Sequence, residues 1–287
     1  MKQPLFTGVC TALVTPFLGG RVNYPMLQIL LRRQMDANIP AVVIAGTTGE
    51  APTLSDGEKL ELFQRAKQTC GDQMLVIAGT GSNDTNHAVM LSIAAEKAGA
   101  DALLVVSPYY NKANQDGIIA HYNAICESVN IPVIIYNVPS RTGLDIPVSV
   151  YQALSKLPNI AGIKEASTSI QKTGKILQSC DLPVWSGNDD MTTPVISLGG
   201  QGVISVLSNV APLKTMLMTE AALSGDFDTA AALHSKLLPL MDALFSDVNP
   251  IPVKTAMKLL GYDCGSCRLP LSTLSEEKVQ KLKEVLM

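Results

Sequence analysis

Short apolar runs rich in β-branched residues recur along the chain, and they constrain its fold more than any other feature of the sequence. Such runs begin near residues 41, 74, 102, 132, 160, 184 and 203, at intervals of 19 to 33 residues, and an earlier candidate covers residues 8–14. They are almost continuously apolar, without the alternation of a half-exposed strand, as strands buried on both faces must be. The pattern therefore predicts eight buried, parallel strands.

Helical patterns fill the intervals between these runs. Ser55 and Glu58 have the spacing of a capping box, and the helix that they begin is expected to end near Gly71. A second helical face is apolar at positions 88, 91, 95 and 98 and is expected to stop at Gly99. Alternating strands and helices favour an α/β fold of the (β/α)8 TIM-barrel type. A doubly wound open sheet is the alternative, but no G-x-G-x-x-G motif follows the first strand.

The pattern changes near residue 224, where the strand–helix units end. Residues 226–245 and 275–286 have helical patterns, and no strand is expected between them. We therefore predict a barrel domain over residues 1–224 and a C-terminal helical domain over residues 225–287. Because no segment rich in Gly or Ser separates the two, the helical appendage is expected to pack on the barrel.

Composition excludes several classes of function. The chain has 287 residues, with 22 Lys and Arg against 25 Asp and Glu, so it has no excess of positive charge for binding nucleic acid or an anionic membrane. Its N-terminus does not have the apolar segment of a signal peptide, and no apolar run approaches the ~20 residues that span a bilayer. The charged fraction of 16% is below the usual ~25%, which indicates a large core or buried subunit interfaces. A cytoplasmic metabolic protein is expected.

The cysteines and histidines do not indicate metal or redox chemistry. The C-x-x-C motif at Cys264 and Cys267 lacks the second pair or the βα context that such a role needs. His87, His121 and His234 fall in expected helices and do not have metal-binding spacing. The sequence contains no P-loop, G-x-S-x-G or zinc motif. We therefore expect no metal and no nucleotide cofactor, and we assign the chemistry to Lys, Tyr, Thr and Arg side chains.

Candidate site residues are those at the carboxyl ends of the strands, where barrel enzymes place their active sites. The second expected strand ends in GTTGE at residues 46–50, whose two glycines suit a tight loop that presents N–H groups to an anion. The fourth strand ends in SPYYNK at residues 107–112 and the fifth in YNVPSR at residues 136–141, which brings three tyrosines to one mouth. Each motif alone also fits an ordinary turn or a packed tyrosine. Together they favour proton transfer.

The sixth expected strand is the most informative, because it ends in a lysine. Lys164 follows an apolar run and precedes Glu165. One interpretation is a buried ion pair between Lys164 and Glu165 or another carboxylate. The other is a Schiff-base lysine, activated because burial disfavours its ammonium form. The second interpretation fits carbonyl chemistry through an imine.

Taken in order, these motifs resemble the dihydrodipicolinate synthase family of pyruvate-dependent class I aldolases, and the resemblance covers essentially the whole chain. The matching motifs are GTTGE at residues 46–50, AGTGSND at 78–84, PYYNK at 108–112, YNVPSRTG at 136–143, GIKEA at 162–166, SGND at 186–189, GGQGVISV at 199–206 and NPIPVK at 249–254. Each motif is weak alone, but the set in this order is highly specific.

The resemblance implies that pyruvate condenses with L-aspartate-4-semialdehyde on the route to diaminopimelate and lysine. No cofactor would be needed, because pyruvate would be bound covalently to the enzyme as an imine on Lys164. Tyr136 would act as the general acid and base, and Thr47 and Tyr110 would complete a hydroxyl relay to solvent. Tyr109 would reach across a subunit interface.

The resemblance also implies substrate-binding residues. Thr48 resembles the residue that holds the pyruvate carboxylate, and Gly187 and Ile204 match positions that shape the site through main-chain carbonyls. Arg141 would bind the second substrate's carboxylate with two parallel hydrogen bonds. The SRTG sequence around Arg141 distinguishes this family from sialic acid lyases and sugar-acid aldolases. A related 2-keto-acid aldolase and a non-catalytic barrel are the alternatives.

Regulation and assembly are also implied by the resemblance. Lysine-inhibited relatives line an interface pocket with two histidines and a glutamate, whereas the matched positions here are Asp56, Lys59 and His87. Asn83 and Tyr109 are retained. A cationic Lys59 would repel an ammonium ligand, so we expect weak or no feedback inhibition by lysine. Relatives are homotetramers, built as dimers of dimers, or homodimers, and either assembly is expected here.

Overall fold

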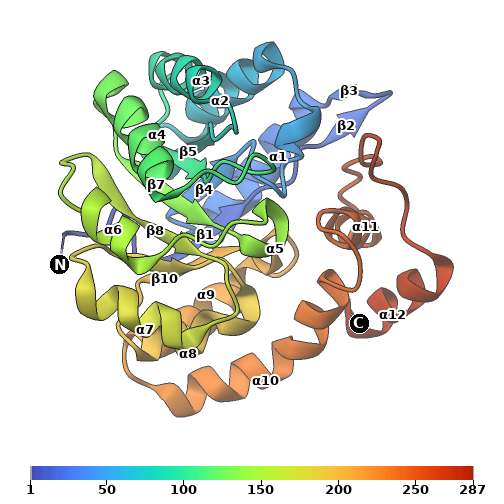
Figure 1. Ribbon diagram of the computed structural model, residues 1–287. Coiled ribbons are helices and arrows are strands. Elements are labelled where there is room, and N and C mark those ends of the chain that lie inside the picture. The colour runs from blue at the N-terminus through green and yellow to red at the C-terminus, as the bar shows by residue number, and fades with distance from the viewer. Residues whose placement is uncertain (1, 287) are drawn as a thin grey trace.

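Eight parallel strands within residues 2–286, the part of the chain that the computed structural model describes, close into a barrel (Figure 1). The order around the barrel follows the sequence, and the last strand pairs with the first. The strands are β1 (Gly8–Ala12), β4 (Ala41–Ile44), β5 (Leu75–Gly79), β6 (Ala102–Val106), β7 (Val133–Asn137), β8 (Ile160–Glu165), β9 (Val184–Ser186) and β10 (Gly202–Ser205). The barrel prediction is confirmed, and the open sheet is excluded.

Helices alternate with these strands and form the outer layer. They are α1 (Tyr24–Asp36), α2 (Asp56–Cys70), α3 (Thr85–Lys97), α4 (Gln115–Ser128), α5 (Pro139–Thr142), α6 (Val148–Leu154), α7 (Ile170–Ser179), α8 (Thr192–Ser197) and α9 (Pro212–Leu223). The predicted capping box of α2 is present: Ser55 Oγ accepts from Glu58 N–H, and Glu58 Oε2 accepts from Ser55 N–H. Helix α2 ends at Cys70 with Gly71 as its C-cap, next to the expected end.

Two apolar layers explain why the strand sequences do not alternate. In β7, Ile134 and Tyr136 belong to the cluster inside the barrel, whereas Val133 and Ile135 belong to the cluster between the strands and the helices. Successive side chains of a strand point to opposite faces, so both faces of β7 are buried. A continuous apolar run is the consequence.

An aromatic pair fills the barrel interior near Lys164. The rings of Phe6 and Trp185 are stacked with centroids 4.6 Å apart, and Trp185 Nε1–H donates to the Phe6 carbonyl at 3.2 Å. Gly162 leaves space for this indole, since a Cβ at residue 162 would lie 2.5 Å from the Trp185 ring. Gly162 and Lys164 are on the same face of β8, so this aromatic pair forms an apolar part of the surroundings of Lys164 inside the barrel.

The C-terminal residues form helices that lie together along one side of the barrel in Figure 1. They are α10 (Phe227–Leu244), α11 (Ile251–Leu259) and α12 (Glu276–Leu286). Helices α10 and α12 confirm the prediction, but α11 was not expected. Pro250 at its N-cap and Pro252 in its first turn resemble a loop in sequence. Proline is well tolerated at both positions because the first N–H groups of a helix have no partner within it.

The predicted domain boundary falls in the turn between α9 and α10. The outermost residues of the two predicted domains, 1 and 287, lie outside the described part of the chain, and the division into two domains stays a prediction. A short hairpin of β2 (Phe17–Leu18) and β3 (Arg21–Val22) follows β1 and was also not expected. None of the helices that residues 2–286 form combines the length and the apolar character that crossing a lipid bilayer requires.

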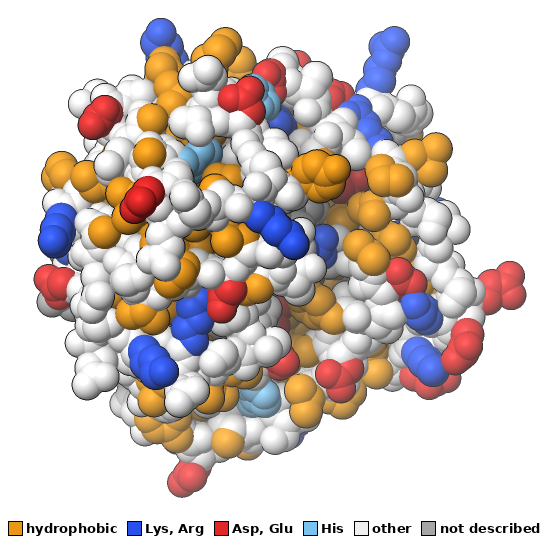
Figure 2. All heavy atoms as spheres, in the orientation of Figure 1, with side chains coloured by type: hydrophobic (Ala, Val, Ile, Leu, Met, Phe, Trp, Pro, Cys, Tyr) orange, Lys and Arg blue, Asp and Glu red, His pale blue; other side chains and the backbone are white. Residues whose placement is uncertain are grey.

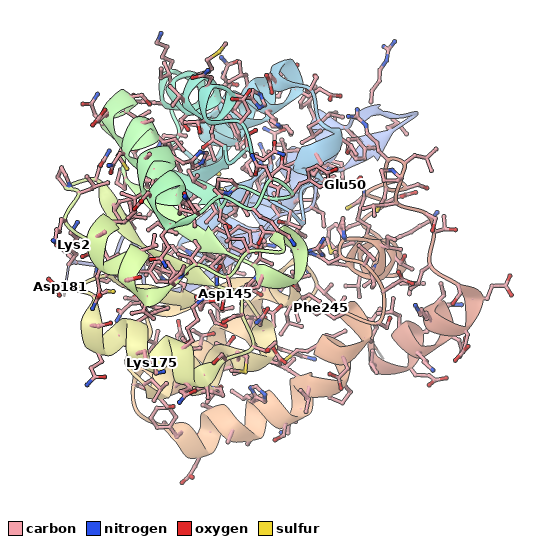
Figure 3. All side chains as sticks on the ribbon, viewed as in Figure 1. Lys2, Glu50, Asp145, Lys175, Asp181 and Phe245 are labelled. Carbon is pink, nitrogen blue, oxygen red and sulfur yellow. The ribbon has the colours of Figure 1, made fainter. Side chains whose placement is uncertain are left out.

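A buried ion pair connects the helical region to the barrel. Figure 3 labels Glu50 where the barrel meets the C-terminal helices. The Glu50 carboxylate lies 2.8 Å from Nζ of Lys254 in α11, and the Lys254 ammonium also donates to the main-chain carbonyls of Thr15 and Ser266. The expectation that the appendage packs on the barrel is therefore confirmed, and the contact lies on the loop that carries Thr47 and Thr48.

Candidate active site

Tyr136 and Lys164 lie side by side at the carboxyl ends of β7 and β8. The two residues are in register between the paired strands, and Nζ of Lys164 is 4.3 Å from the centre of the Tyr136 ring. Both residues are 6% exposed. Both side chains point into the barrel because the register and the period of two give them the same face. The structure therefore brings together the lysine and the phenol that the sequence singled out.

The Lys164 ammonium has no hydrogen-bond or ion-pair partner among residues 2–286; its contact is with the Tyr136 ring. The predicted alternative, an ion pair between Lys164 and Glu165, is wrong. Adjacent residues of a strand point to opposite faces, so Glu165 faces the helices outside the barrel. Glu165 instead lies 3.6 Å from Nζ of Lys172 in α7.

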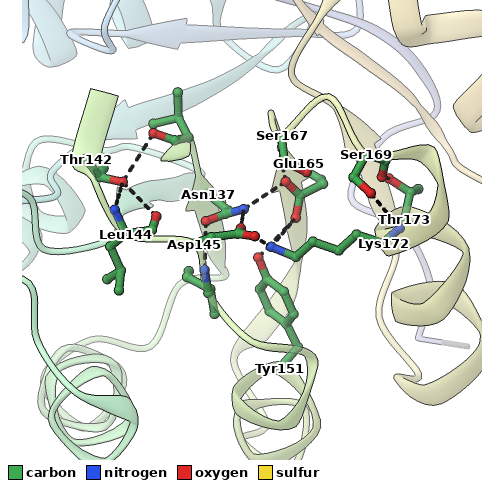
Figure 4. A network of polar contacts seen from close by, with 12 residues as sticks. Asn137, Thr142, Leu144, Asp145, Tyr151, Glu165, Ser167, Ser169, Lys172 and Thr173 are labelled. Carbon is green, nitrogen blue, oxygen red and sulfur yellow. Dashed lines mark hydrogen bonds and ion pairs between the residues drawn. The ribbon is translucent and has the colours of Figure 1, made fainter. Parts of the chain in front are cut away.

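Glu165 is the centre of a buried polar network that fixes the ends of β7 and β8 (Figure 4). Its Oε1 accepts from Asn137 Nδ2 at 2.8 Å and from Ser167 N–H at 2.7 Å, and its Oε2 accepts from the Tyr151 hydroxyl at 3.2 Å. Lys172 also pairs with Asp145. Burial, together with the negative charge of Glu165, holds the pKa of Tyr151 well above its ordinary value. The network holds the backbone that carries Tyr136 and Lys164 from the side opposite the site.

The loop that carries Thr47 and Thr48 follows β4 in a strained, tightly packed path. Ala45 has a φ of 53°, and a Cβ at Gly79 would lie 2.2 Å from the Ala45 carbonyl oxygen, so only glycine fits on the neighbouring strand. Thr15 Oγ1 donates to the Gly49 carbonyl at 2.7 Å. These contacts hold the two threonines at the barrel mouth.

A cavity of about 530 Å³ opens at this mouth. Its wall contains four of the predicted site residues, which are Thr47, Tyr109, Tyr136 and Arg141. Lys164 is not part of this wall and borders it through Tyr136. Figure 2 shows a hollow between the barrel and the C-terminal helices, with positive and negative side chains interspersed on this face.

Arg141 and Thr48 both contact Asn249, which begins the NPIPVK motif and was not predicted as a site residue. Arg141, in the short helix α5, donates from Nη2 to the Asn249 main-chain carbonyl at 3.2 Å. Thr48 Oγ1 accepts from Asn249 Nδ2 at 3.0 Å. The NPIPVK motif at residues 249–254 was the only sequence signal for this contact.

Of the predicted main-chain contributors, Gly187 follows β9, the neighbour of β8, and Ile204 lies in β10, on the other side of β9. Ile204 is buried in β10, and Gly187 N–H donates to the Glu165 carbonyl at 2.7 Å. Nearby, Oδ2 of the buried Asp189 accepts from the N–H groups of Val206 and Leu207. Burial raises the pKa of Asp189, which its hydrogen bonds and the charge of Lys164 oppose.

Cys10 also faces the barrel interior, beside Ile204 of the neighbouring strand. Burial raises the pKa of its thiol, and the positive charge of Lys164 acts in the opposite direction. Cys10 thus remains a neutral, apolar neighbour of the site.

Tyr109 and Tyr110 follow β6 but take different positions within the chain. Tyr109, predicted at an interface, lies on the cavity wall of its own chain. Tyr110, predicted in the hydroxyl relay, is 89% exposed and is not part of that wall. A φ of 73° at Tyr110 places its backbone in the left-handed region, and the side chain points to solvent. Within one chain, Tyr110 therefore does not join Thr47 and Tyr136.

The three residues matched to the lysine pocket form their own cluster on the cavity wall. His87 Nε2 lies 2.9 Å from Asp56 Oδ2, and Lys59 Nζ lies 3.7 Å from Asp56 Oδ1. Burial lowers the pKa of Lys59, and Asp56 opposes this change. Across residues 2–286, no group of three or more His, Cys, Asp and Glu side chains is arranged to hold a metal ion.

Comparisons with known proteins agree with this geometry. The model of the Dihydrodipicolinate synthetase family matches residues 5–287. The 4-hydroxy-tetrahydrodipicolinate synthase of Acetivibrio thermocellus is 46% identical over 288 residues, which cover 100% of this chain and 98% of the relative. The crystal structure of dihydrodipicolinate synthase from Aquifex aeolicus is 42% identical with a TM-score of 0.96, covering 98% of this chain and 97% of that one.

A third relative was solved with a ligand. The structure of the chloride-inhibited dihydrodipicolinate synthase from Acinetobacter baumannii, complexed with pyruvate, is 37% identical with a TM-score of 0.96 and covers 98% of both chains. The sequence match, the barrel and the pair of Tyr136 and Lys164 at its mouth lead to one conclusion. The chain belongs to the dihydrodipicolinate synthetase family.

Proposed function

We propose that this protein is a lyase of the family that condenses pyruvate with L-aspartate-4-semialdehyde to give 4-hydroxy-tetrahydrodipicolinate. The observation that carries the proposal is the buried Lys164 ammonium, which has no charged partner within residues 2–286 and lies 4.3 Å from the Tyr136 ring. The names of the relatives support the choice of reaction, and one relative was crystallised with pyruvate. Lys164 is then the only group that carries the reaction covalently, and no cofactor is required.

The chemistry begins when the neutral Lys164 amine attacks C2 of pyruvate, and loss of water leaves an imine. The imine nitrogen withdraws electrons, so a proton leaves C3 and an enamine forms. The enamine carbon attacks the aldehyde carbon of the second substrate, and the new alkoxide takes up a proton. The amino group of that substrate then attacks C2 and displaces Lys164, which closes the ring.

Tyr136 moves the protons in these steps, because its ring is the group in contact with Lys164. Thr47 shares the cavity wall with Tyr136 and passes protons on from it. Tyr110 is the third member of the proposed relay. Because Tyr110 is 89% exposed and lies away from its own cavity wall, it serves the cavity of a second copy of the chain.

Pyruvate is held by the hydroxyl of Thr48 and by the main-chain carbonyls of Gly187 and Ile204. Arg141 holds the carboxylate of the semialdehyde, which its position on the cavity wall supports. A guanidinium offers two parallel N–H groups to a carboxylate, and a lysine at this position offers only a point charge.

Reduction with borohydride in the presence of pyruvate tests the central assignment. The reagent converts the imine to a stable secondary amine, which peptide mass spectrometry then locates. We expect a pyruvyl adduct on Lys164. An adduct on another residue, or the absence of any adduct, contradicts the proposal.

The second substrate is tested separately, because a related 2-keto-acid aldolase would form the same imine. We expect turnover with L-aspartate-4-semialdehyde and none with sialic acid. Turnover of sialic acid without turnover of the semialdehyde would favour the aldolase. No turnover of either substrate would favour the non-catalytic barrel.

We further propose that lysine inhibits this enzyme weakly or not at all. Lys59 places a cation on the cavity wall at a position matched to the lysine pocket, next to the pair formed by His87 and Asp56. A second ammonium would be repelled there. Unchanged condensation at millimolar lysine supports this proposal, and half-inhibition below ~1 mM contradicts it. We expect a homotetramer or homodimer in the cytoplasm, and sedimentation analysis measures the assembly.

A further inference from the structure

Asn249 contacts both Thr48 and Arg141, the residues proposed to bind the two substrates. It lies between α10 and α11, in the C-terminal helical region, and its side chain crosses to the barrel. Its Nδ2 donates to Thr48 Oγ1 at 3.0 Å, and its main-chain carbonyl accepts from Arg141 Nη2 at 3.2 Å. The proposed function assigns Thr48 to pyruvate and Arg141 to the aldehyde, so one residue anchors both.

The direction of the first hydrogen bond determines what Thr48 can do. An amide NH2 group can only donate, so the Thr48 oxygen is the acceptor in this contact. The single hydroxyl proton of Thr48 is then free to point elsewhere. A carboxylate only accepts hydrogen bonds, so a hydroxyl that binds it must donate. The contact with Asn249 thus leaves Thr48 in the state that pyruvate binding requires.

Packing and stability do not account for this asparagine. Asn249 is buried, and its Oδ1 has no hydrogen-bond partner among the described residues. A buried carbonyl oxygen without a partner costs stability, and an apolar side chain at this position would avoid that cost. The amide is better explained by what its NH2 group does to Thr48.

The chain around Asn249 is tied down on both sides. Asp247, two residues earlier, pairs with Lys278 of α12. Lys254, five residues later, pairs with Glu50, which ends the same loop that carries Thr48. The donor and the acceptor are therefore held by one connected set of contacts, as precise orientation of a hydroxyl requires.

We propose that Asn249 is a positioning residue: its amide commits the Thr48 hydroxyl to donate to the carboxylate of pyruvate, while its main-chain carbonyl orients Arg141. This inference rests on the proposed function, which assigns pyruvate as the ligand of Thr48.

Two substitutions of Asn249 distinguish the donor role of its amide group from the shape of its side chain. Asn249→Ala removes the donor but keeps the main-chain carbonyl, so we expect the KM for pyruvate to rise about 3- to 10-fold and the KM for the semialdehyde to stay within about 2-fold. Asn249→Asp keeps the shape but offers only acceptors, so the Thr48 hydroxyl turns toward it and a negative charge faces the pyruvate carboxylate. We expect the KM for pyruvate to rise on the order of 100-fold.

The proposal is tested by comparing the pyruvate KM values of Asn249→Ala and Asn249→Asp. A purely structural role predicts a loss of stability in both variants with similar pyruvate KM values for the folded enzyme, and the positioning role predicts a higher pyruvate KM for Asn249→Asp. A pyruvate KM for Asn249→Asp that is equal to or below that of Asn249→Ala overturns the proposal. Should Asn249→Ala lose thermal stability, Asn249→Asp alone decides, because the proposal requires at least a 10-fold rise in its pyruvate KM.

Asp247→Asn is the matched control. It perturbs the same loop through its pair with Lys278 but has no contact with Thr48 or Arg141, so both KM values are expected to stay within about 2-fold of the unmodified chain. Borohydride trapping of the unmodified chain with pyruvate is run in parallel. No adduct on Lys164 shows that the proposed function fails. An adduct on Lys164 together with unchanged pyruvate KM values in the Asn249 variants shows that only the inference on Asn249 fails.

Discussion

Lys164 is notable for what surrounds it. Apolar groups fill the barrel beside it, its neighbour Glu165 points to the opposite face, and the nearest ring is that of Tyr136. An ammonium loses hydration energy in such a place, and Lys164 has no hydrogen-bond or ion-pair partner among residues 2–286 to replace it. The same burial would be costly for a lysine with no chemical role.

Tyr136→Phe tests the proton-transfer role at the level of one atom. The substitution removes the hydroxyl but keeps the ring that contacts Lys164, so pyruvate still binds. We expect kcat to fall by about 10²- to 10⁴-fold, the usual contribution of a positioned acid or base. Steady-state kinetics and the rate of imine formation measure the effect.

Tyr122→Phe is the control for that substitution. The Tyr122 hydroxyl is also buried, but it donates to the Val105 carbonyl and lies away from the cavity wall. Its loss should cost about 1 kcal/mol of stability and leave kcat within about 2-fold. Equal losses of kcat in the two variants would argue against a role for Tyr136 in proton transfer.

At the scale of elements, helix α11 and the loop after β4 support each other through the pair of Glu50 and Lys254. Both side chains are almost wholly buried, so each charge depends on the other. Lys254→Met should lower the free energy of unfolding by about 3 to 5 kcal/mol, because it leaves the Glu50 carboxylate buried without its cation. Denaturant unfolding measures this change.

The controls for this prediction come from the same helix. Lys258→Met removes a lysine whose distance to Asp263 is 3.9 Å in an exposed pair, so it should cost less than about 1 kcal/mol. The double variant Glu50→Gln and Lys254→Met leaves no unpaired charge and should be more stable than Lys254→Met alone. A double variant that is less stable than Lys254→Met would contradict this account.

Glu58, in the first turn of helix α2, makes a pH-dependent contribution to the free energy of unfolding. Hydrogen bonds from Arg268 hold the pKa of Glu58 at about 2, below its ordinary value of 4.5. A lowered pKa means that the folded chain favours the carboxylate, so this contribution is complete above about pH 4.5 and is lost as the pH falls toward 2. Glu58→Gln should lower stability by about 1 to 2 kcal/mol at pH 7, since the pair is partly exposed.

The difference between Glu58→Gln and the unmodified chain should shrink as the pH is lowered from 7 to 3, which urea unfolding at each pH measures. Glu220→Gln changes an exposed glutamate that has no ion pair among residues 2–286 and serves as the control. A difference that stays constant with pH would show that Glu58 acts through packing and not through its charge.

At the scale of the whole molecule, the exposed position of Tyr110 links activity to assembly. Lys164→Ala lacks the nucleophile, and Tyr110→Phe lacks the proposed relay hydroxyl, so each variant alone should have little activity. If Tyr110 serves the cavity of a second copy, a mixed dimer has one complete site. Random mixing of equal amounts should therefore restore about a quarter of the full activity.

Mixing under conditions that allow subunit exchange, followed by a rate assay, tests this prediction. The control mixes Lys164→Ala with Tyr136→Phe, because both of these residues belong to the same cavity. In that pair each site lacks either the lysine or the phenol of its own chain, so a mixed dimer contains no complete site and no recovery is expected. Failure of the Tyr110 pair to exceed this control, under conditions where subunits exchange, would contradict the proposal that Tyr110 serves the cavity of a second copy.

The apolar runs in the sequence were enough to predict the barrel and the ends of its strands. A strand between two apolar layers must be apolar on both faces, and that requirement is written into consecutive residues, as in β7. Because parallel strands of a barrel share one mouth, the residues after the strands could be gathered into a site without knowing any distance. Thr47, Tyr136 and Arg141 indeed line one cavity.

The tertiary structure decided the contacts that depend on side-chain direction and on long-range packing. The face of Glu165, the exposure of Tyr110 and the reach of Asn249 to Thr48 cannot be obtained from local patterns. Asn249 and Thr48 are separated by 201 residues, and their contact exists only because α10 and α11 fold back onto the barrel. Periodicity is a local property of the chain, whereas hydrogen bonds between distant segments depend on how the completed elements pack.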